Sequence, residues 1–68
     1  MGKYDALWVH VRRDGRTGFQ LSFDEIEAIL GFPIDHSFLN FKRELLQYGY
    51  RVGRISMKVK SVSFEKCE

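Results

Sequence analysis

Cysteine is nearly absent from this chain of 68 residues. Because Cys67 is the only one, a disulfide within the chain and most structural zinc sites are excluded. A domain of this length buries only about 60% of the surface that its unfolded chain exposes, so its core gives little net stability. The reinforcement that remains open is a partner chain, and a homodimer is one possibility.

Long apolar runs and a dominant charge are absent as well. No apolar run approaches the roughly 20 residues of a membrane-spanning helix, and residues 1–8 show no signal-peptide pattern. We therefore expect a soluble, cytoplasmic protein that does not bind membranes. The 11 basic and 9 acidic residues give a net charge of +2, which permits an anionic partner without requiring one.

Motifs for catalysis and cofactor binding are also missing. The sequence shows no nucleophile paired with a base and no paired-carboxylate site. Gly15 and Gly18 flank a turn but do not have the spacing of a phosphate-binding loop. His10 and His36 fall on different predicted elements and do not form a metal-binding pair. We predict that the chain is not an enzyme and holds no cofactor and no metal ion.

The first part of the chain has a helical pattern followed by a strand pattern. Apolar residues at helical spacing predict a helix that ends at Arg12-Arg13; they are Tyr4, Leu7, Trp8 and Val11. The alternation in residues 9–11 leaves a strand open for the same segment. Further on, Phe19, Leu21 and Phe23 alternate with polar residues and predict a short strand.

The second predicted helix has the clearest boundaries. Ser22 to Glu25 forms a capping-box pattern, in which each end of the motif can hydrogen-bond a backbone amide of the other. Gly31 suits the left-handed residue that ends a helix, and Pro33 cannot continue the hydrogen-bond ladder. The sequence therefore predicts a helix from about Phe23 to Leu30.

Residues 35–48 predict a third helix, with Asp35 as its N-cap and Gly49 just after its end. At about 100° per residue, one set of side chains faces the core: Phe38, Phe41, Leu45 and Tyr48. A second set falls within about 60° on the opposite side: His36, Asn40, Arg43 and Gln47. That second face has no acidic residue at its centre, so it is a candidate for contacting base edges or phosphates. The alternative is an ordinary solvated face.

The last part of the chain predicts two strands. Alternation from Tyr50 shifts its parity across Gly53-Arg54, which predicts a β-bulge, and it restarts at Val62 after a hairpin turn near Met57 to Lys60. Pairing this hairpin with the early strand gives a three-stranded antiparallel sheet beside three helices. The predicted fold is α+β, a winged helix-turn-helix of order α-β-α-α-β-β, in a single domain of residues 1–68.

Three parts of the chain carry motifs that belong together. They are Tyr4-Asp5-Ala6-Leu7, residues 21–33 (LSFDEIEAILGFP), and Gly49-Tyr50-Arg51-Val52 with Val62-Ser63-Phe64. In these motifs the chain resembles a small, functionally uncharacterised bacterial family of winged-helix-like domains, which read Y-D-x-L, L-T-F-x-E-I-E-x-I-L-G-x-P, G-W-x-V and V-x-F. The resemblance implies the same fold and supplies no catalytic residue. Longer members carry a tryptophan-rich insertion in the third-helix region, whereas this chain passes directly from Ile34 to Ser37.

The first functional hypothesis is a small DNA-binding protein that acts by occupancy, as a regulator or accessory factor. The third helix would enter the groove of double-stranded DNA, and the hairpin wing would contact its backbone. The candidate binding residues are His36, Asn40, Arg43, Gln47, Arg51, Arg54, Lys58 and Lys60. The acidic residues of the second helix count against this hypothesis, because that helix would lie near phosphates; they are Asp24, Glu25 and Glu27.

The second hypothesis is a winged-helix protein-interaction module, such as a phage or mobile-element inhibitor or adaptor. The same basic faces would then dock on an acidic protein surface or on a ribonucleoprotein. Lys58 and Lys60 also admit a purely structural explanation, since lysines on exposed strands discourage edge-to-edge pairing. The sequence leaves both hypotheses open.

Overall fold

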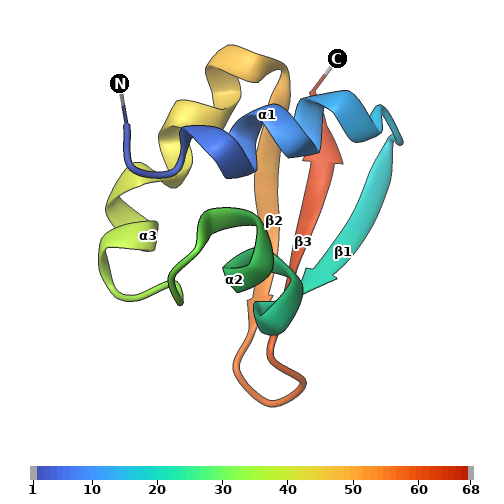
Figure 1. Ribbon diagram of the computed structural model, residues 1–68. Coiled ribbons are helices and arrows are strands. Elements are labelled where there is room, and N and C mark those ends of the chain that lie inside the picture. Colours follow the sequence, from blue (N-terminus) through green and yellow to red (C-terminus); the bar gives the residue numbers. More distant parts are fainter. Residues whose placement is uncertain (1, 68) are drawn as a thin grey trace.

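The computed structural model describes residues 2–67 and has the predicted α+β, winged-helix-like architecture (Figure 1). Its elements are α1 (Asp5–Asp14), β1 (Gly18–Ser22), α2 (Phe23–Leu30), α3 (Ser37–Phe41), the 3-10 helix η1 (Lys42–Tyr48), β2 (Tyr50–Ser56) and β3 (Ser61–Lys66). The predicted order of helices and strands is therefore confirmed. Within residues 2–67, no helix combines the length and the apolar character needed to cross a membrane.

The sheet has the strand order β1-β3-β2, and both strand pairs are antiparallel. Because β3 is in the middle, Phe64 stands opposite Phe19 on one side and Val52 on the other. The register of β2 against β3 shifts between Val52 and Ile55, which confirms the predicted bulge. Residues 57–60 form the hairpin turn, also as predicted.

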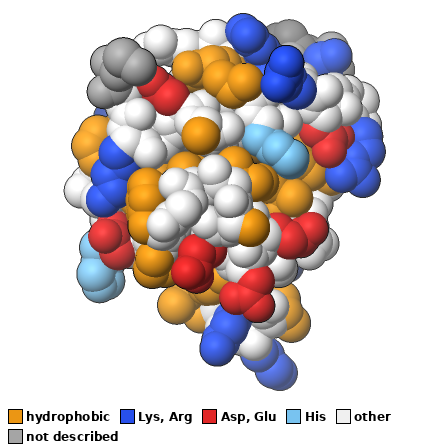
Figure 2. All heavy atoms as spheres, in the orientation of Figure 1, with side chains coloured by type: hydrophobic (Ala, Val, Ile, Leu, Met, Phe, Trp, Pro, Cys, Tyr) orange, Lys and Arg blue, Asp and Glu red, His pale blue; other side chains and the backbone are white. Residues whose placement is uncertain are grey.

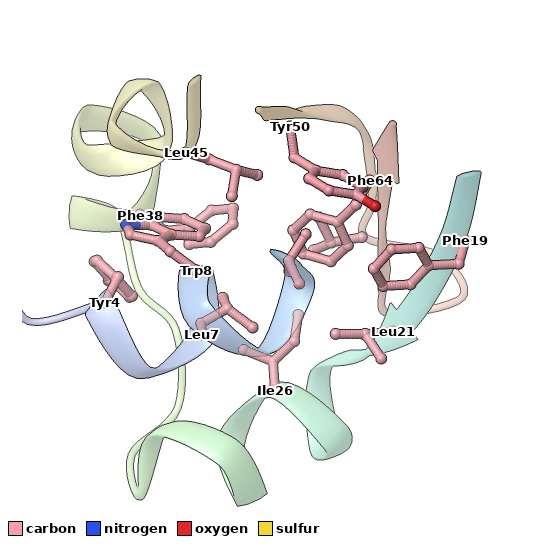
Figure 3. Close-up of a cluster of buried hydrophobic side chains, with 12 residues drawn as sticks. Tyr4, Leu7, Trp8, Phe19, Leu21, Ile26, Phe38, Leu45, Tyr50 and Phe64 are labelled. Atoms are coloured by element: carbon pink, nitrogen blue, oxygen red, sulfur yellow. The ribbon is translucent and has the colours of Figure 1, made fainter. Parts of the chain in front are cut away.

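The core lies between the helices and one face of the sheet. The first segment is a helix rather than a strand, and its predicted apolar stripe is fully buried: Tyr4, Leu7, Trp8 and Val11. From the sheet, Phe19, Leu21 and Phe64 point into the same cluster (Figure 3). The core therefore rests on burial of aromatic and aliphatic side chains, the main favourable contribution to folding.

The capping box fixes where α2 begins, immediately after β1. The Ser22 hydroxyl accepts from the Glu25 amide at 3.0 Å, and the Glu25 carboxylate accepts from the Ser22 amide at 2.8 Å. These bonds lower the pKa of Glu25, chiefly through the Ser22 amide. At the other end, Gly31 has the left-handed conformation predicted for it, with φ of 86°.

The third helix differs from its prediction. Only Ser37–Phe41 is α-helical, and Lys42–Tyr48 winds as a 3-10 helix before Gly49 ends it in the left-handed region, as predicted. The predicted cap also shifts by one position: Asp35 Oδ1 accepts from the Ser37 amide at 2.9 Å, but the N-cap position itself is His36.

The change of winding has a physical reason in the core. A 3-10 helix has 3.0 residues per turn, so side chains at i and i+3 eclipse. This winding aligns the buried Leu45 with the half-buried Tyr48. It also lets Glu44 Oε1 accept from Trp8 Nε1 at 3.0 Å. Phe41, predicted to face the core, packs its ring against the buried Tyr4 at a centroid distance of 5.8 Å but remains 37% exposed.

Replacing Ser22 by alanine should weaken the junction of β1 and α2. The Ser22→Ala variant loses one bond of the capping box, and we expect its free energy of unfolding to fall by about 1 kcal/mol. Urea denaturation followed by circular dichroism measures the change. Thr17→Ala, at an exposed position outside the helices and strands, is the matched hydroxyl control. Equal stability of both variants would contradict the role of the cap.

A candidate binding surface between α3 and the hairpin

The eight candidate binding residues are all exposed, in two groups. His36, Asn40, Arg43 and Gln47 lie along α3 and η1, and Arg51, Arg54, Lys58 and Lys60 lie on β2 and its hairpin turn. The second group is not a patch of four free positive charges, because Arg51 forms an ion pair with Glu65. The distance from Arg51 Nη2 to Glu65 Oε1 is 2.7 Å. Arg54 lies by the bulge, where its amide donates to Ser63 Oγ at 2.8 Å.

The 3-10 winding changes the polar face of the third helix. At 120° per residue, Gln47 eclipses Glu44 and turns away from the line of Asn40 and Arg43. Leu46 takes its place in line with Arg43, and Leu46 is exposed. The face predicted for base contacts therefore keeps His36, Asn40 and Arg43, but it carries an apolar side chain where an amide was predicted.

A groove of about 590 Å³ lies between α3, the start of α2 and the hairpin. It is lined by Phe23, Ile34, Asp35, His36, Phe38, Leu39, Ile55 and Met57. Hydrophobic side chains thus form most of the lining, and only Asp35 and His36 are polar. The groove brings His36 together with the hairpin, so the structure does place α3 and the wing on one surface.

Large apolar side chains stand exposed at and near this groove. Leu39 on α3 and Met57 on the hairpin turn line it and are 51% and 74% exposed. Val59, on the same turn, is 68% exposed and lines a neighbouring hollow with Arg54 and Lys58. Soluble monomers rarely leave such side chains together in water unless the surface binds something. Hydrophobic side chains are visible beside the basic tip of the hairpin in Figure 2.

The wall formed by α3 is held in place by contacts with α1. The Phe38 ring packs edge-on against Tyr4 at a centroid distance of 5.5 Å and lies 5.8 Å from Trp8 (Figure 3). We call these three residues the aromatic junction. The Tyr4 hydroxyl lies 2.8 Å from Ser37 Oγ, so the same junction also reaches the first turn of α3.

The hairpin wall is held by α2 and by its own turn. The Phe23 amide donates to the Lys60 carbonyl at 2.8 Å, which attaches the end of the turn to the first residue of α2. Within the turn, the Val59 amide donates to Ser56 Oγ at 3.3 Å. Lys60 has a φ of 54°, a left-handed conformation that is uncommon for a residue with a side chain.

Charges of both signs lie on the two elements beside the groove, although none of these four side chains lines it. Lys58 and Lys60 stand on the hairpin turn, while Asp24 follows the groove residue Phe23 and Glu27 lies one helical turn beyond it. None of these four charged groups forms an ion pair with another of residues 2–67. In Figure 2, acidic side chains over α2 lie next to the basic side chains of the hairpin.

Asp35 differs from these four charged residues, because its carboxylate accepts hydrogen bonds from Ser37 at the start of α3. The Ser37 hydroxyl and then the Ser37 amide donate to it, which lowers the pKa of Asp35. Lys3 Nζ lies 3.7 Å from its other oxygen. No group of three histidine, cysteine, aspartate or glutamate side chains within residues 2–67 is placed to hold a metal ion.

Comparison with known proteins adds no identification: no family model, curated protein or solved structure matches the chain. The resemblance to a bacterial winged-helix-like family stays a prediction. What the chain does must therefore be argued from its own surface.

Sequence reasoning missed the apolar members of this surface, chiefly Leu39, Met57 and Val59. Two signals for them were present. The hairpin turn has no Asn-Gly or Asp-Gly pair and carries two apolar residues instead. On a helical wheel, Leu39 lies about 100° from Asn40, at the border between the predicted core face and the predicted polar face.

Acid should loosen the start of α3. Because the pKa of Asp35 is lower in the folded chain than in the unfolded chain, its contribution to stability is present above about pH 4 and is lost as the pH falls through the lowered value. We expect Asp35→Asn to be less stable at pH 7 and to lose less stability between pH 7 and acid. Urea denaturation at a series of pH values measures both effects.

Glu65→Gln is the control for this acid effect, since Glu65 lies on β3 and its carboxylate accepts from Arg51 rather than from the start of α3. If the Asp35→Asn variant shows the same loss of stability in acid as the unaltered chain, the proposed role of Asp35 is wrong.

Proposed function

We propose that this chain is a winged-helix protein-interaction module that acts by occupancy, with a protein segment seated in the groove between α3 and the hairpin. The observation that supports this proposal is the apolar lining of the groove together with the exposed Leu39 and Met57 at its border. No reaction step is required of the chain in this role.

The energetics favour an apolar occupant. Fully burying one large aliphatic side chain gains about 1.5–3 kcal/mol relative to leaving it in water. Leu39, Met57 and Val59 are each more than half exposed, so a partner that covers all three gains about twice this energy. A phosphate backbone would gain none of it, because charged oxygens cannot replace water at an apolar surface.

DNA binding is the second candidate, and it has its own supporting observation. Asn40 and Arg43 on the third helix are exposed, as are Lys58 and Lys60 on the hairpin, so the side chains that would contact bases and phosphates are free. Against it stand the free carboxylates of Asp24 and Glu27 on the same side of the molecule, which would repel phosphates.

Photo-crosslinking tests the protein-interaction proposal. We expect a benzoylphenylalanine introduced at Leu39 to form covalent adducts with protein in cells that naturally encode this chain. The same probe at Gln47 is the matched control, because Gln47 is exposed on η1 and does not line the groove. Adducts at Gln47 but not at Leu39 would contradict the proposal.

One substitution distinguishes protein binding from DNA binding, because it should weaken the first and should not weaken the second. Leu39→Lys puts a positive charge on an exposed apolar position. Protein binding in the groove should fall at least about tenfold, since a lysine cannot be buried there without cost. DNA binding should be retained or strengthened, because each added cation adds a phosphate contact.

Fluorescence anisotropy with a duplex oligonucleotide over a range of salt concentrations measures the DNA arm of this test. Under the protein-interaction proposal, the anisotropy of the oligonucleotide does not rise as the unaltered chain or the Leu39→Lys variant is added. Tight binding that weakens steeply with salt, and that the Arg43→Ala/Lys58→Ala variant loses, would establish DNA binding instead.

A further inference from the structure

We infer that the groove between α3 and the hairpin is occupied by the hairpin turn of a second copy of this chain, in a two-fold symmetric dimer. This inference rests on the proposed function, because it names the partner that uses the same groove. Three features of the described surface carry it.

The first feature is that the hairpin turn, which projects from the molecule, and the groove lie next to each other on one surface. Met57 lines the groove and begins the turn that carries Val59, and both side chains are mostly exposed. A two-fold interface uses the same patch on both copies, so each copy must offer a part that inserts and a part that receives. This surface offers both, since the turn projects beyond the sheet (Figure 1).

The second feature is the arrangement of charge. The turn carries Lys58 and Lys60, and α2, which begins beside the groove, carries Asp24 and Glu27. All four lack an ion-pair partner among residues 2–67. A partner of one sign would meet repulsion at one side of the groove. A second copy related by a two-fold axis places the lysines of each hairpin against the acidic residues of the other copy's α2.

The third feature is the size of the chain. With 68 residues and a single cysteine, the chain has a small core and no internal cross-link to support it. Without disulfides or a metal ion, association with a partner is one way for a chain of this size to gain stability. Covering the exposed Leu39, Met57 and Val59 in a dimer would supply apolar burial that one copy cannot reach alone.

A charge-exchange experiment tests the dimer. One variant carries Lys58→Glu and Lys60→Glu, and the other carries Asp24→Lys and Glu27→Lys. Sedimentation equilibrium should show a dimer for the unaltered chain and a dissociation constant raised at least about tenfold for each variant alone, because like charges then meet across both halves of the interface. An equimolar mixture of the two variants should restore the dimer, since opposite charges again face each other at both contacts.

Folding is controlled within the same experiment. All four positions are exposed, and circular dichroism should show each variant folded. If the acidic and basic groups instead paired within one copy, an equimolar mixture of the two variants would restore nothing. A monomeric unaltered chain, or variants that dimerise alone as well as they do together, would overturn the inference.

The proposed function and this inference fail in different ways. Purified chain with benzoylphenylalanine at Leu39 should give an adduct of twice the chain's mass. If the adducts form only with other proteins in cells, the groove is a protein-binding site but the second copy is not its occupant. If no adduct forms in either setting, both proposals are wrong.

Discussion

The packing of Phe38 against Tyr4 and Trp8 is the contact on which the rest of the molecule depends. α3 has five α-helical residues, far fewer than an isolated helix needs to be stable in water. Its position must therefore come from tertiary contacts, and the aromatic junction provides them through three buried rings and the hydrogen bond between the Tyr4 and Ser37 hydroxyls. If the junction opened, α3 would leave the hairpin and the groove would lose one wall.

The elements with local signals were predictable from the sequence. The capping box at Ser22, the left-handed Gly31 and Gly49, and the bulge after Val52 each depend on residues close in the chain, and each is confirmed. The winding of residues 42–48 was not predictable in this way. It depends on where Leu45 and Glu44 meet α1, which is a property of the packed core.

The binding surface shows the same division between local and long-range information. That His36, Asn40 and Arg43 are exposed followed from periodicity, because a helix with one apolar stripe turns its other residues to water. The groove could not be predicted, since it exists only where α3, α2 and the hairpin meet. The break in the third helix then brings the exposed Leu46 into line with Arg43, where an ideal helix would place the amide of Gln47.

Native-state hydrogen exchange tests most directly whether the aromatic junction holds α3. The amides of Leu39 and Lys42, which donate to the carbonyls of His36 and Phe38, should exchange with an opening free energy close to that of Trp8 in α1, because α3 and α1 open together. Exchange of these two amides at the rate of an unstructured peptide, while Trp8 remains protected, would show that α3 moves independently of the core. The groove would then have no fixed wall, and the account given for its binding would be wrong.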